Sequence, residues 1–263
     1  WIGEILFRTK LSENLFKGLS PWMQKLPGGL IHVNVVGCAL FAAISGSSAA
    51  TVATVGKMSI PELRKRNYPE KILLGSLAGS GTLGLLIPPS IILIIYGVAV
   101  QESIAKLFIA GIIPGIMIAL IFMSYVIIWS LINKKSMPKI IEEYSFFEKI
   151  KRSKQLLPVI ILILAVIGSI YTGIATATEA ASLGVVGALI LSYFQKSLTL
   201  KTFKSSLLGA TKTSCMIAFI LAGSTFLSLA MGFTGLPRNL ALWIQNMESV
   251  SYTHLTLPTN REV

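Results

Sequence analysis

Two short polar, glycine-rich stretches interrupt apolar segments, and their residue types could bind an ion. The first is Ser45-Gly46-Ser47-Ser48, followed by Thr51, and the second is Gly79-Ser80-Gly81-Thr82. Both offer hydroxyl and backbone carbonyl oxygens but no carboxylate. Neutral oxygens suit Na⁺, whereas Ca²⁺ and Mg²⁺ generally take carboxylate ligands. Together the stretches predict one sodium site, although each Ser or Thr taken singly is better explained as a small residue that allows close helix packing.

A Pro-Pro pair follows the second stretch. Pro88 and Pro89 cannot donate backbone hydrogen bonds, and their rings clash with the preceding turn of a continuous helix. We therefore expect two half-helices, residues 72–78 and 90–100, with an unwound segment between them. Unpaired backbone groups are costly in hydrocarbon, so such a break is expected to line a cavity or bind something. The alternative is a kinked helix packed on a neighbour.

An anionic substrate would suit this break, because the N-terminal ends of half-helices carry positive partial charge. We predict that Thr51, Pro88, Pro89 and Ser90 contact the substrate, together with Glu179 if that carboxylate is buried near the membrane. The alternative for Glu179 is a local role, in which Thr176 or Thr178 caps a helix and Glu179 interacts with the helix dipole.

Catalytic chemistry finds little support in the sequence. The apolar segments contain no Ser/His/Asp set, no Cys/His pair and no two-carboxylate site, as acid–base or nucleophilic catalysis would need. His32 and Asn34 are expected to cap a helix at the membrane interface rather than to bind a metal. We predict no catalytic residue and no cofactor, with Na⁺ as a coupling ion.

The composition indicates an all-α polytopic membrane protein. Of the 263 residues, 53% are hydrophobic and 13% are charged, and the mean hydropathy is +0.74. Apolar runs of about 20 residues recur, which is the length of a membrane-spanning helix. The net charge is +12, but the basic residues lie in short loops between apolar runs. This is the pattern of cytoplasmic loops and not of a nucleic-acid-binding surface.

The placement of the basic loops predicts the topology. Residues 28–56 are too short for two spans, yet basic residues flank them on both sides. A re-entrant hairpin with its tip at residues 45–48 keeps both flanks in the cytoplasm. The following segments then keep every strongly basic loop on that side: a broken helix with its return helix, 72–131, and three further helices, 156–231.

The two ends of the chain differ from its middle. Residues 1–27 predict an interfacial amphipathic helix, and the initial Trp1 suggests that the true start is missing. An amphipathic helix over 235–249 loosely resembles residues 13–25, as an inverted repeat would, and chance is the alternative explanation. Residues 250–263 are polar without an apolar period and are interpreted as a foreign tail.

Five motifs follow one another along the chain: HVNV (32–35), FAAISGSSAAT (41–51), GTLGLLIPPS (81–90), LFIAGIIPG (107–115) and ATEAA (177–181). In this order they resemble the large membrane subunit of tripartite ATP-independent periplasmic (TRAP) transporters. The resemblance, over residues 13–249, implies a sodium-driven, elevator-type carrier built on inverted repeats in a bacterial inner membrane. It implies a periplasmic substrate-binding protein and a small four-helix membrane subunit as partners, with organic acids such as C4-dicarboxylates or sialic acids as substrates.

In that family, the first hairpin and the broken helix after it supply one sodium site, and they match the two breaks above. The family's first helices are missing here, as are its second hairpin and second broken helix, so half of the transport site is absent. The competing interpretations are a channel, which would use the same oxygens but symmetric copies of one filter, and an intramembrane enzyme using Glu179 and His32.

Overall fold

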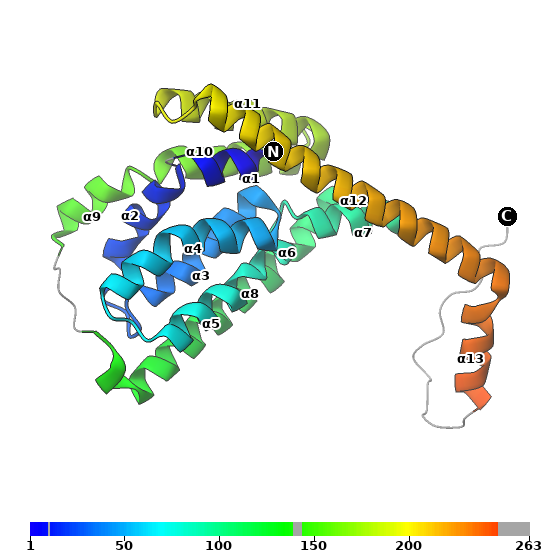
Figure 1. Ribbon diagram of the computed structural model, residues 1–263, viewed down its shortest axis with the longest axis horizontal. Helices are drawn as coiled ribbons and strands as arrows, with labels where there is room; N and C mark the ends of the chain where they lie inside the picture. The colour runs from blue at the N-terminus through cyan, green and yellow to red at the C-terminus, as the bar shows by residue number, and fades with distance from the viewer. Residues whose placement is uncertain (10, 139–143, 247–263) are drawn as a thin grey trace. The chain divides into compact units, whose positions relative to one another are not determined.

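The structure is a computed structural model that describes residues 1–9, 11–138 and 144–246 (Figure 1). Helices make up its regular structure, and the described residues contain no strand. Its helices are α1 Ile2–Arg8, α2 Leu11–Met23, α3 Ile31–Ser45, α4 Ser48–Lys65, α5 Glu70–Gly81, α6 Leu83–Leu86, α7 Ile91–Ala99, α8 Ile104–Ile132, α9 Phe146–Ser153, α10 Leu157–Tyr171, α11 Ala177–Phe194, α12 Leu200–Thr234 and α13 Leu236–Asn246. The chain divides into two compact units, Trp1–Ala210 and Thr211–Val263.

The membrane class predicted from composition is confirmed. Among the described residues, four helical stretches are long and apolar enough to cross a bilayer: Glu70–Ala99, Ile104–Ile132, Ala177–Phe194 and Leu200–Thr234. A fifth is added if α9 and α10, bent by 54° relative to each other, form one span. Apolar side chains on α8 remain exposed, such as Ile113 at 77%. The chain is therefore a multi-pass helical membrane protein.

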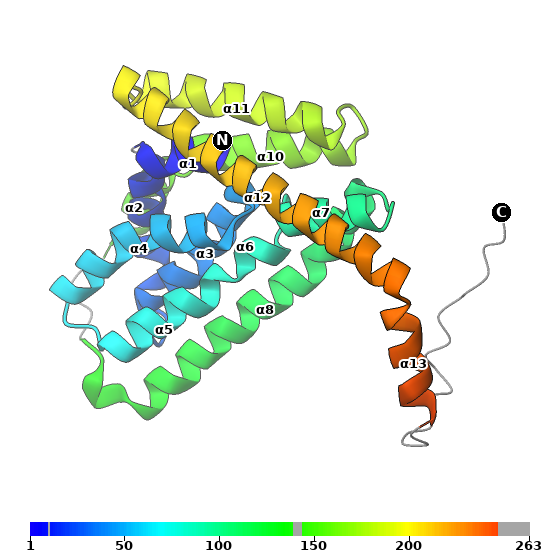
Figure 2. The ribbon, with the colours of Figure 1, turned by 45° about the vertical axis from the view of Figure 1, so that its right-hand side comes forward.

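Helices α3 and α4 form a hairpin in which they lie side by side (Figures 1 and 2). Gly46 ends α3 in the left-handed conformation, with φ of 60°, and the Ser47 hydroxyl caps α4 by accepting from the Ala50 N–H at 3.4 Å. At the open end, the Leu30 N–H donates to the Tyr68 hydroxyl at 3.1 Å. The two arms therefore start and finish at the same end of the fold.

The break in the following segment is shorter than expected. We expected residues 79–89 to be unwound, but α5 continues through Gly81 and α6 follows after the turn residue Thr82, so the longer non-helical stretch is only Ile87 to Ser90. The glycines stay helical because small residues let α5 approach its neighbours: Gly81 lies against Val52 of α4, and Gly79 against Phe122 of α8. The prolines, which lack an N–H, end the helix where the sequence indicated.

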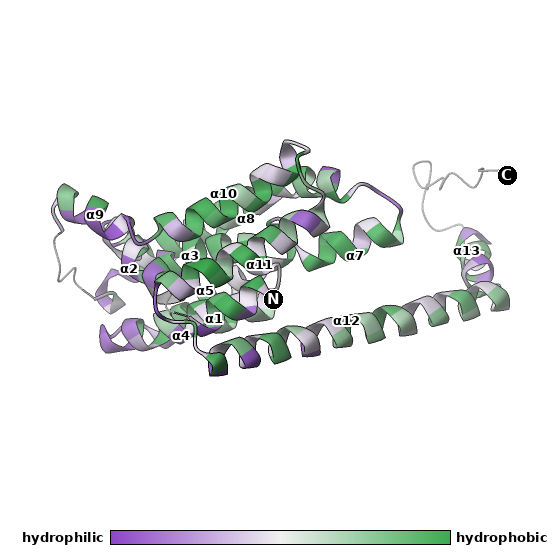
Figure 3. Cartoon of the chain, turned by 90° about the horizontal axis from the view of Figure 1, so that it is seen from above, coloured by the Kyte–Doolittle hydropathy of each residue, from purple (hydrophilic) through white to green (hydrophobic). Residues whose placement is uncertain are grey.

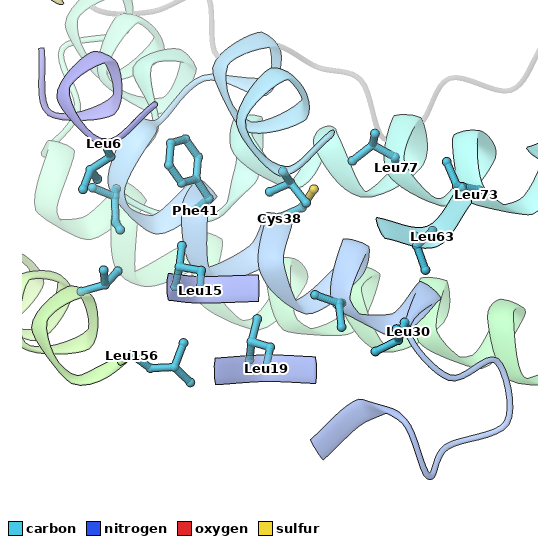
Figure 4. Close-up of a cluster of buried hydrophobic side chains, with 14 residues drawn as sticks. Leu6, Leu15, Leu19, Leu30, Cys38, Phe41, Leu63, Leu73, Leu77 and Leu156 are labelled. Atoms are coloured by element: carbon cyan, nitrogen blue, oxygen red, sulfur yellow. The ribbon is translucent and has the colours of Figure 1, made fainter. Parts of the chain in front are cut away.

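The N-terminal residues form two helices rather than the single interfacial helix expected over 1–27. Thr9, in an extended conformation, ends α1, and α2 starts at Leu11. Their apolar faces pack on the hairpin: Leu6, Leu15 and Leu19 are buried around Phe41 (Figure 4). Because this apolar face is buried against α3 and α4, α1 and α2 are packed parts of the fold and not helices that lie alone at the membrane interface.

The second unit contains the later part of α12 and all of α13, which are joined at Gly235 with φ of 65°. Helix α13, Leu236–Asn246, falls within the range expected to be amphipathic, 235–249. The proposed foreign tail, 250–263, lies outside the described residues.

Candidate functional site

The tip of the hairpin docks on the proline break. The Ile91 N–H, at the start of α7, donates to the Gly46 carbonyl oxygen at 3.2 Å. A Cβ at Gly46 would lie 2.6 Å from the Pro89 carbonyl oxygen, and one at Gly84 would lie 2.9 Å from the Ser47 carbonyl oxygen. Glycine at both positions therefore allows direct backbone contact. We call this contact, between residues 45–51 and 84–91, the tip–break junction.

A cluster of oxygens lies at the tip. The Thr51 hydroxyl donates to the Ser47 carbonyl at 2.7 Å, and the Ser45 hydroxyl lies 2.9 Å from the Thr51 hydroxyl and 3.3 Å from the same carbonyl. Thr51 is fully buried. These three oxygens, the hydroxyl cluster, have lone pairs that a cation could share once the hydroxyl hydrogens turn away.

On the other side of the junction, Ser90 is fully buried and its hydroxyl donates to the Leu85 carbonyl at 2.6 Å. This hydrogen bond satisfies one of the carbonyls that the prolines leave without an N–H partner. The sequence-predicted residues Ser45, Gly46, Ser47, Thr51, Pro89 and Ser90 are thus brought together at one place.

A cavity of about 200 Å³ adjoins the junction. Ser45, Gly46 and Pro89 line it beside apolar side chains, and so do Ala177 and Ala181 from the first turn and a half of α11. The N-terminal ends of α7 and α11 therefore reach the same cavity, and both carry positive partial charge. Both helix ends could therefore attract an anionic group that enters this cavity.

The second predicted stretch is divided among different surroundings. Gly81 packs beside the tip, with the Ser48 carbonyl oxygen 3.8 Å from where its Cβ would be, whereas Gly79 faces α8. Ser80 is buried, and its hydroxyl has no hydrogen-bond partner among the described residues. Thr82 is exposed and donates to the Gly79 carbonyl at 2.7 Å. Successive residues of a helix point about 100° apart, so four consecutive residues cannot share one ligand.

Glu179 takes part in a capping box at the start of α11. Its carboxylate accepts from the N–H and the hydroxyl of Thr176, both at 2.8 Å, and its own N–H donates to the Thr176 hydroxyl at 3.3 Å. The side chain is exposed. This geometry matches the capping interpretation, and Glu179 is exposed and does not line the cavity, although Ala177 and Ala181 on either side of it in α11 do.

Sequence reasoning missed the role of Asn34. We expected interfacial capping, but Asn34 is fully buried in α3, and its side-chain N–H groups donate to the Leu73 carbonyl at 3.2 Å and the Ser76 hydroxyl at 3.0 Å. His32 is also buried, with Nε2 2.7 Å from the Pro27 carbonyl. Asn34 therefore ties the first hairpin arm to α5, and a polar residue in an apolar helix was the signal for such a contact.

Comparison with known proteins identifies the family. The family described as "Tripartite ATP-independent periplasmic transporter, DctM component" matches residues 1–258. The chain belongs to this family. The chain is 36% identical to the C4-dicarboxylate TRAP transporter large permease protein DctM of Rhodobacter capsulatus, over 93% of the chain and 58% of the relative. The Pseudomonas aeruginosa protein of the same name is 35% identical, over 84% of the chain and 51% of the relative.

A third relative is the sialic acid TRAP transporter permease protein SiaT of Haemophilus influenzae. It is 35% identical over 85% of the chain and 36% of the relative. The chain thus spans about half the length of the DctM proteins that it matches. The resemblance seen in the motifs is confirmed, and the tip–break junction is formed by two of them, at 41–51 and 81–90.

Proposed function

We propose that this chain forms part of a sodium-coupled secondary transporter that moves a small organic anion across the bacterial inner membrane. It would receive the anion from a periplasmic binding protein and work with a small four-helix membrane subunit. The observation that carries this proposal is the tip–break junction, where a hydroxyl cluster, a broken helix and two helix N-termini meet. Broken helices with this combination hold ions and anionic substrates in secondary transporters.

The sodium ion in this proposal binds the hydroxyl cluster, which consists of the Ser45 and Thr51 hydroxyls and the Ser47 carbonyl oxygen. It also binds the Pro89 carbonyl oxygen across the junction. These ligands are neutral oxygens, and among the described residues no cluster of His, Cys, Asp or Glu could hold a metal ion. A monovalent cation matches such a ligand set better than Ca²⁺ or Mg²⁺. Of the other sodium ligands expected from sequence, Ser48 and Gly81 lie beside the hairpin tip and Ser80 is buried, whereas Gly79 faces α8 and Thr82 is exposed, so the last two are not ligands in this proposal.

The anion in this proposal lies against Thr51, Pro88, Pro89 and Ser90, and Glu179, held in the capping box at the start of α11, does not contact it. The printed names of relatives include C4-dicarboxylate, sialic acid and isethionate transport, and these compounds share an anionic group. The proposed substrate class is therefore a small organic anion, attracted by the N-terminal ends of α7 and α11.

An elevator-type mechanism based on an inverted repeat is part of the same proposal. In such a mechanism the hairpin and the broken helix move together. The backbone hydrogen bond from Ile91 to Gly46, and the absence of room for a Cβ at either glycine of the junction, favour movement as one body, since a close-packed interface resists sliding.

Uptake into proteoliposomes tests the function. A complete transporter that contains this chain, supplied with its binding protein and a labelled C4-dicarboxylate or sialic acid, should accumulate the anion only when sodium is higher outside. Uptake should saturate with anion concentration and stop when an ionophore dissipates the sodium gradient. Flux that does not saturate would indicate a channel instead, and chemical conversion without a gradient would indicate an enzyme.

The re-entrant placement of the hairpin gives a second expected result. Helix α3 has 15 residues, about 22 Å, which is shorter than the roughly 30 Å hydrocarbon core. Cysteines replacing Lys65 and Ser136, both exposed, should resist a membrane-impermeant thiol reagent added to intact cells. A cysteine replacing Glu102, exposed in the turn after α7, should be labelled.

The labelling experiment has a clear contrary outcome. If Lys65→Cys reacts from the periplasmic side while Glu102→Cys does not, the proposed orientation of the hairpin and of the helices that follow it is inverted. Permeabilised cells, in which all three cysteines should react, provide the control. Ser59 is fully buried and would be silent in either topology.

A further inference from the structure

A second cavity, of about 560 Å³, lies far along α4 from the hairpin tip, between α1, α2, α4 and the residues around α9. Its lining is strongly basic: five cationic side chains and one described carboxylate, that of Glu62, contribute to it. The cationic residues are Arg8, Lys17, Lys57, Arg66 and Arg152. They come from three separate basic segments of the sequence, and only the fold places them around one space.

The carboxylates nearby neutralise part of this charge. Glu62 pairs with Arg66 at 2.9 Å, and Glu4 pairs with Arg8 at 2.8 Å. The Lys57 ammonium lies 5.2 Å from the ring centre of Phe7. Among the side chains that the structure describes, an excess of positive charge remains around the cavity, which is the condition for binding an anion.

A buried donor points to a ligand in the same cavity. Gln24 lines it and is only 7% exposed, yet its side-chain Nε2 has no acceptor among the described residues. Buried N–H groups are nearly always satisfied. An oxygen atom of a bound anion would provide the missing acceptor.

Exposed aromatic side chains lie where α2 meets α9, on two helices that also contribute residues to the cavity lining. Trp22 is 41% exposed and Phe146 64% exposed, and their rings pack edge to face at 6.3 Å. The Lys149 ammonium lies 5.5 Å from the centre of the Trp22 ring. Figure 3 shows α9 and the neighbouring ends of the fold rich in hydrophilic residues, whereas α8 and α10 are largely hydrophobic. Aromatic rings between basic and apolar surfaces are typical of lipid headgroup depth.

We propose that this basic cavity binds the phosphate headgroup of an anionic phospholipid. A lipid fits better than a soluble anion because the exposed rings of Trp22 and Phe146 can contact its acyl chains while the cations and Gln24 hold the phosphate. The bound lipid would hold α2, α4 and α9 together at the basic end of the hairpin. The proposal is independent of sodium coupling.

Native mass spectrometry of the detergent-purified chain tests this site, with phosphatidylglycerol and phosphatidylcholine as probes. Wild type should bind phosphatidylglycerol in preference to phosphatidylcholine. The double variant Lys17→Gln/Lys57→Gln should weaken phosphatidylglycerol binding roughly tenfold or more. The matched control Lys201→Gln/Lys204→Gln removes the same charge from exposed positions of α12 that do not line the cavity, and it should bind as wild type does.

A second variant keeps the test valid if the lysine variant does not fold. Gln24→Leu leaves the charge unchanged and removes the buried donor, so it should weaken phosphatidylglycerol binding without lowering the melting temperature of the lipid-free chain. Equal binding of both lipids, or equal weakening in the control, would overturn the proposal. Displacement of the lipid by millimolar inorganic phosphate would also overturn it, in favour of a soluble anion.

Discussion

Replacing Gly46 by alanine should reduce sodium-driven uptake roughly thirtyfold or more, with the protein still inserted in the membrane. The left-handed conformation of Gly46 costs a residue with a Cβ about 1–2 kcal/mol. In addition, the new Cβ would lie 2.6 Å from the Pro89 carbonyl oxygen, a backbone atom that cannot swing aside. Overpacking of this kind costs about 1–3 kcal/mol, so the tip should separate from the break.

Gly173→Ala is the matched control for this variant. Gly173 has a comparable φ of 72°, but a Cβ there would meet nothing within 4 Å. It therefore carries the backbone cost alone and should transport nearly as wild type does. Uptake, protein abundance in the membrane and melting temperature are measured for both variants. Equal losses of uptake in the two would show that docking of the tip on the break is not required.

Replacing Thr51 by valine should raise the sodium concentration for half-maximal uptake about five- to hundredfold, because a ligand oxygen worth about 1–3 kcal/mol is lost. The hydroxyl belongs to the cluster with Ser45 and the Ser47 carbonyl, and its side chain is fully buried. Water therefore has little access to replace it. Ser45→Ala should have an effect of the same size. Uptake against sodium concentration in proteoliposomes gives the value directly.

Thr54→Val is the control for Thr51→Val. Thr54 lies one turn further along α4, is 1% exposed, and donates to the Ala50 carbonyl at 2.7 Å, just as Thr51 donates to Ser47. Losing this bond affects the helix equally but touches no proposed ligand, so sodium dependence should not change. If Thr82→Ala weakens sodium binding and Thr51→Val does not, the ion lies at the second glycine-rich stretch instead.

The local chemistry of the sequence was sufficient to predict several features of the structure. The apolar runs predicted a helical membrane protein, since their length matches a bilayer. Pro88 and Pro89 predicted where the helix ends, because a missing N–H acts on the adjacent turn whatever surrounds it. The pairing of Thr176 with Glu179 was one of two interpretations, and it involves residues only three positions apart. The motifs at 41–51 and 81–90 were sufficient to indicate the family.

Contacts between distant residues were decided only by the tertiary structure. The sequence did not show that Gly79–Gly81 stays helical, because that depends on the surfaces of α4 and α8 that pack against it. Nor did the sequence show that the Gly46 carbonyl accepts a hydrogen bond from Ile91 rather than lying beside Thr82, or that the Asn34 side chain donates to a carbonyl of α5. Residue types specify which groups need a partner, but the directions of helix faces determine which partner they find. The basic cavity has the same origin, since its cationic residues are far apart in the sequence and come together only when the helices that carry them pack.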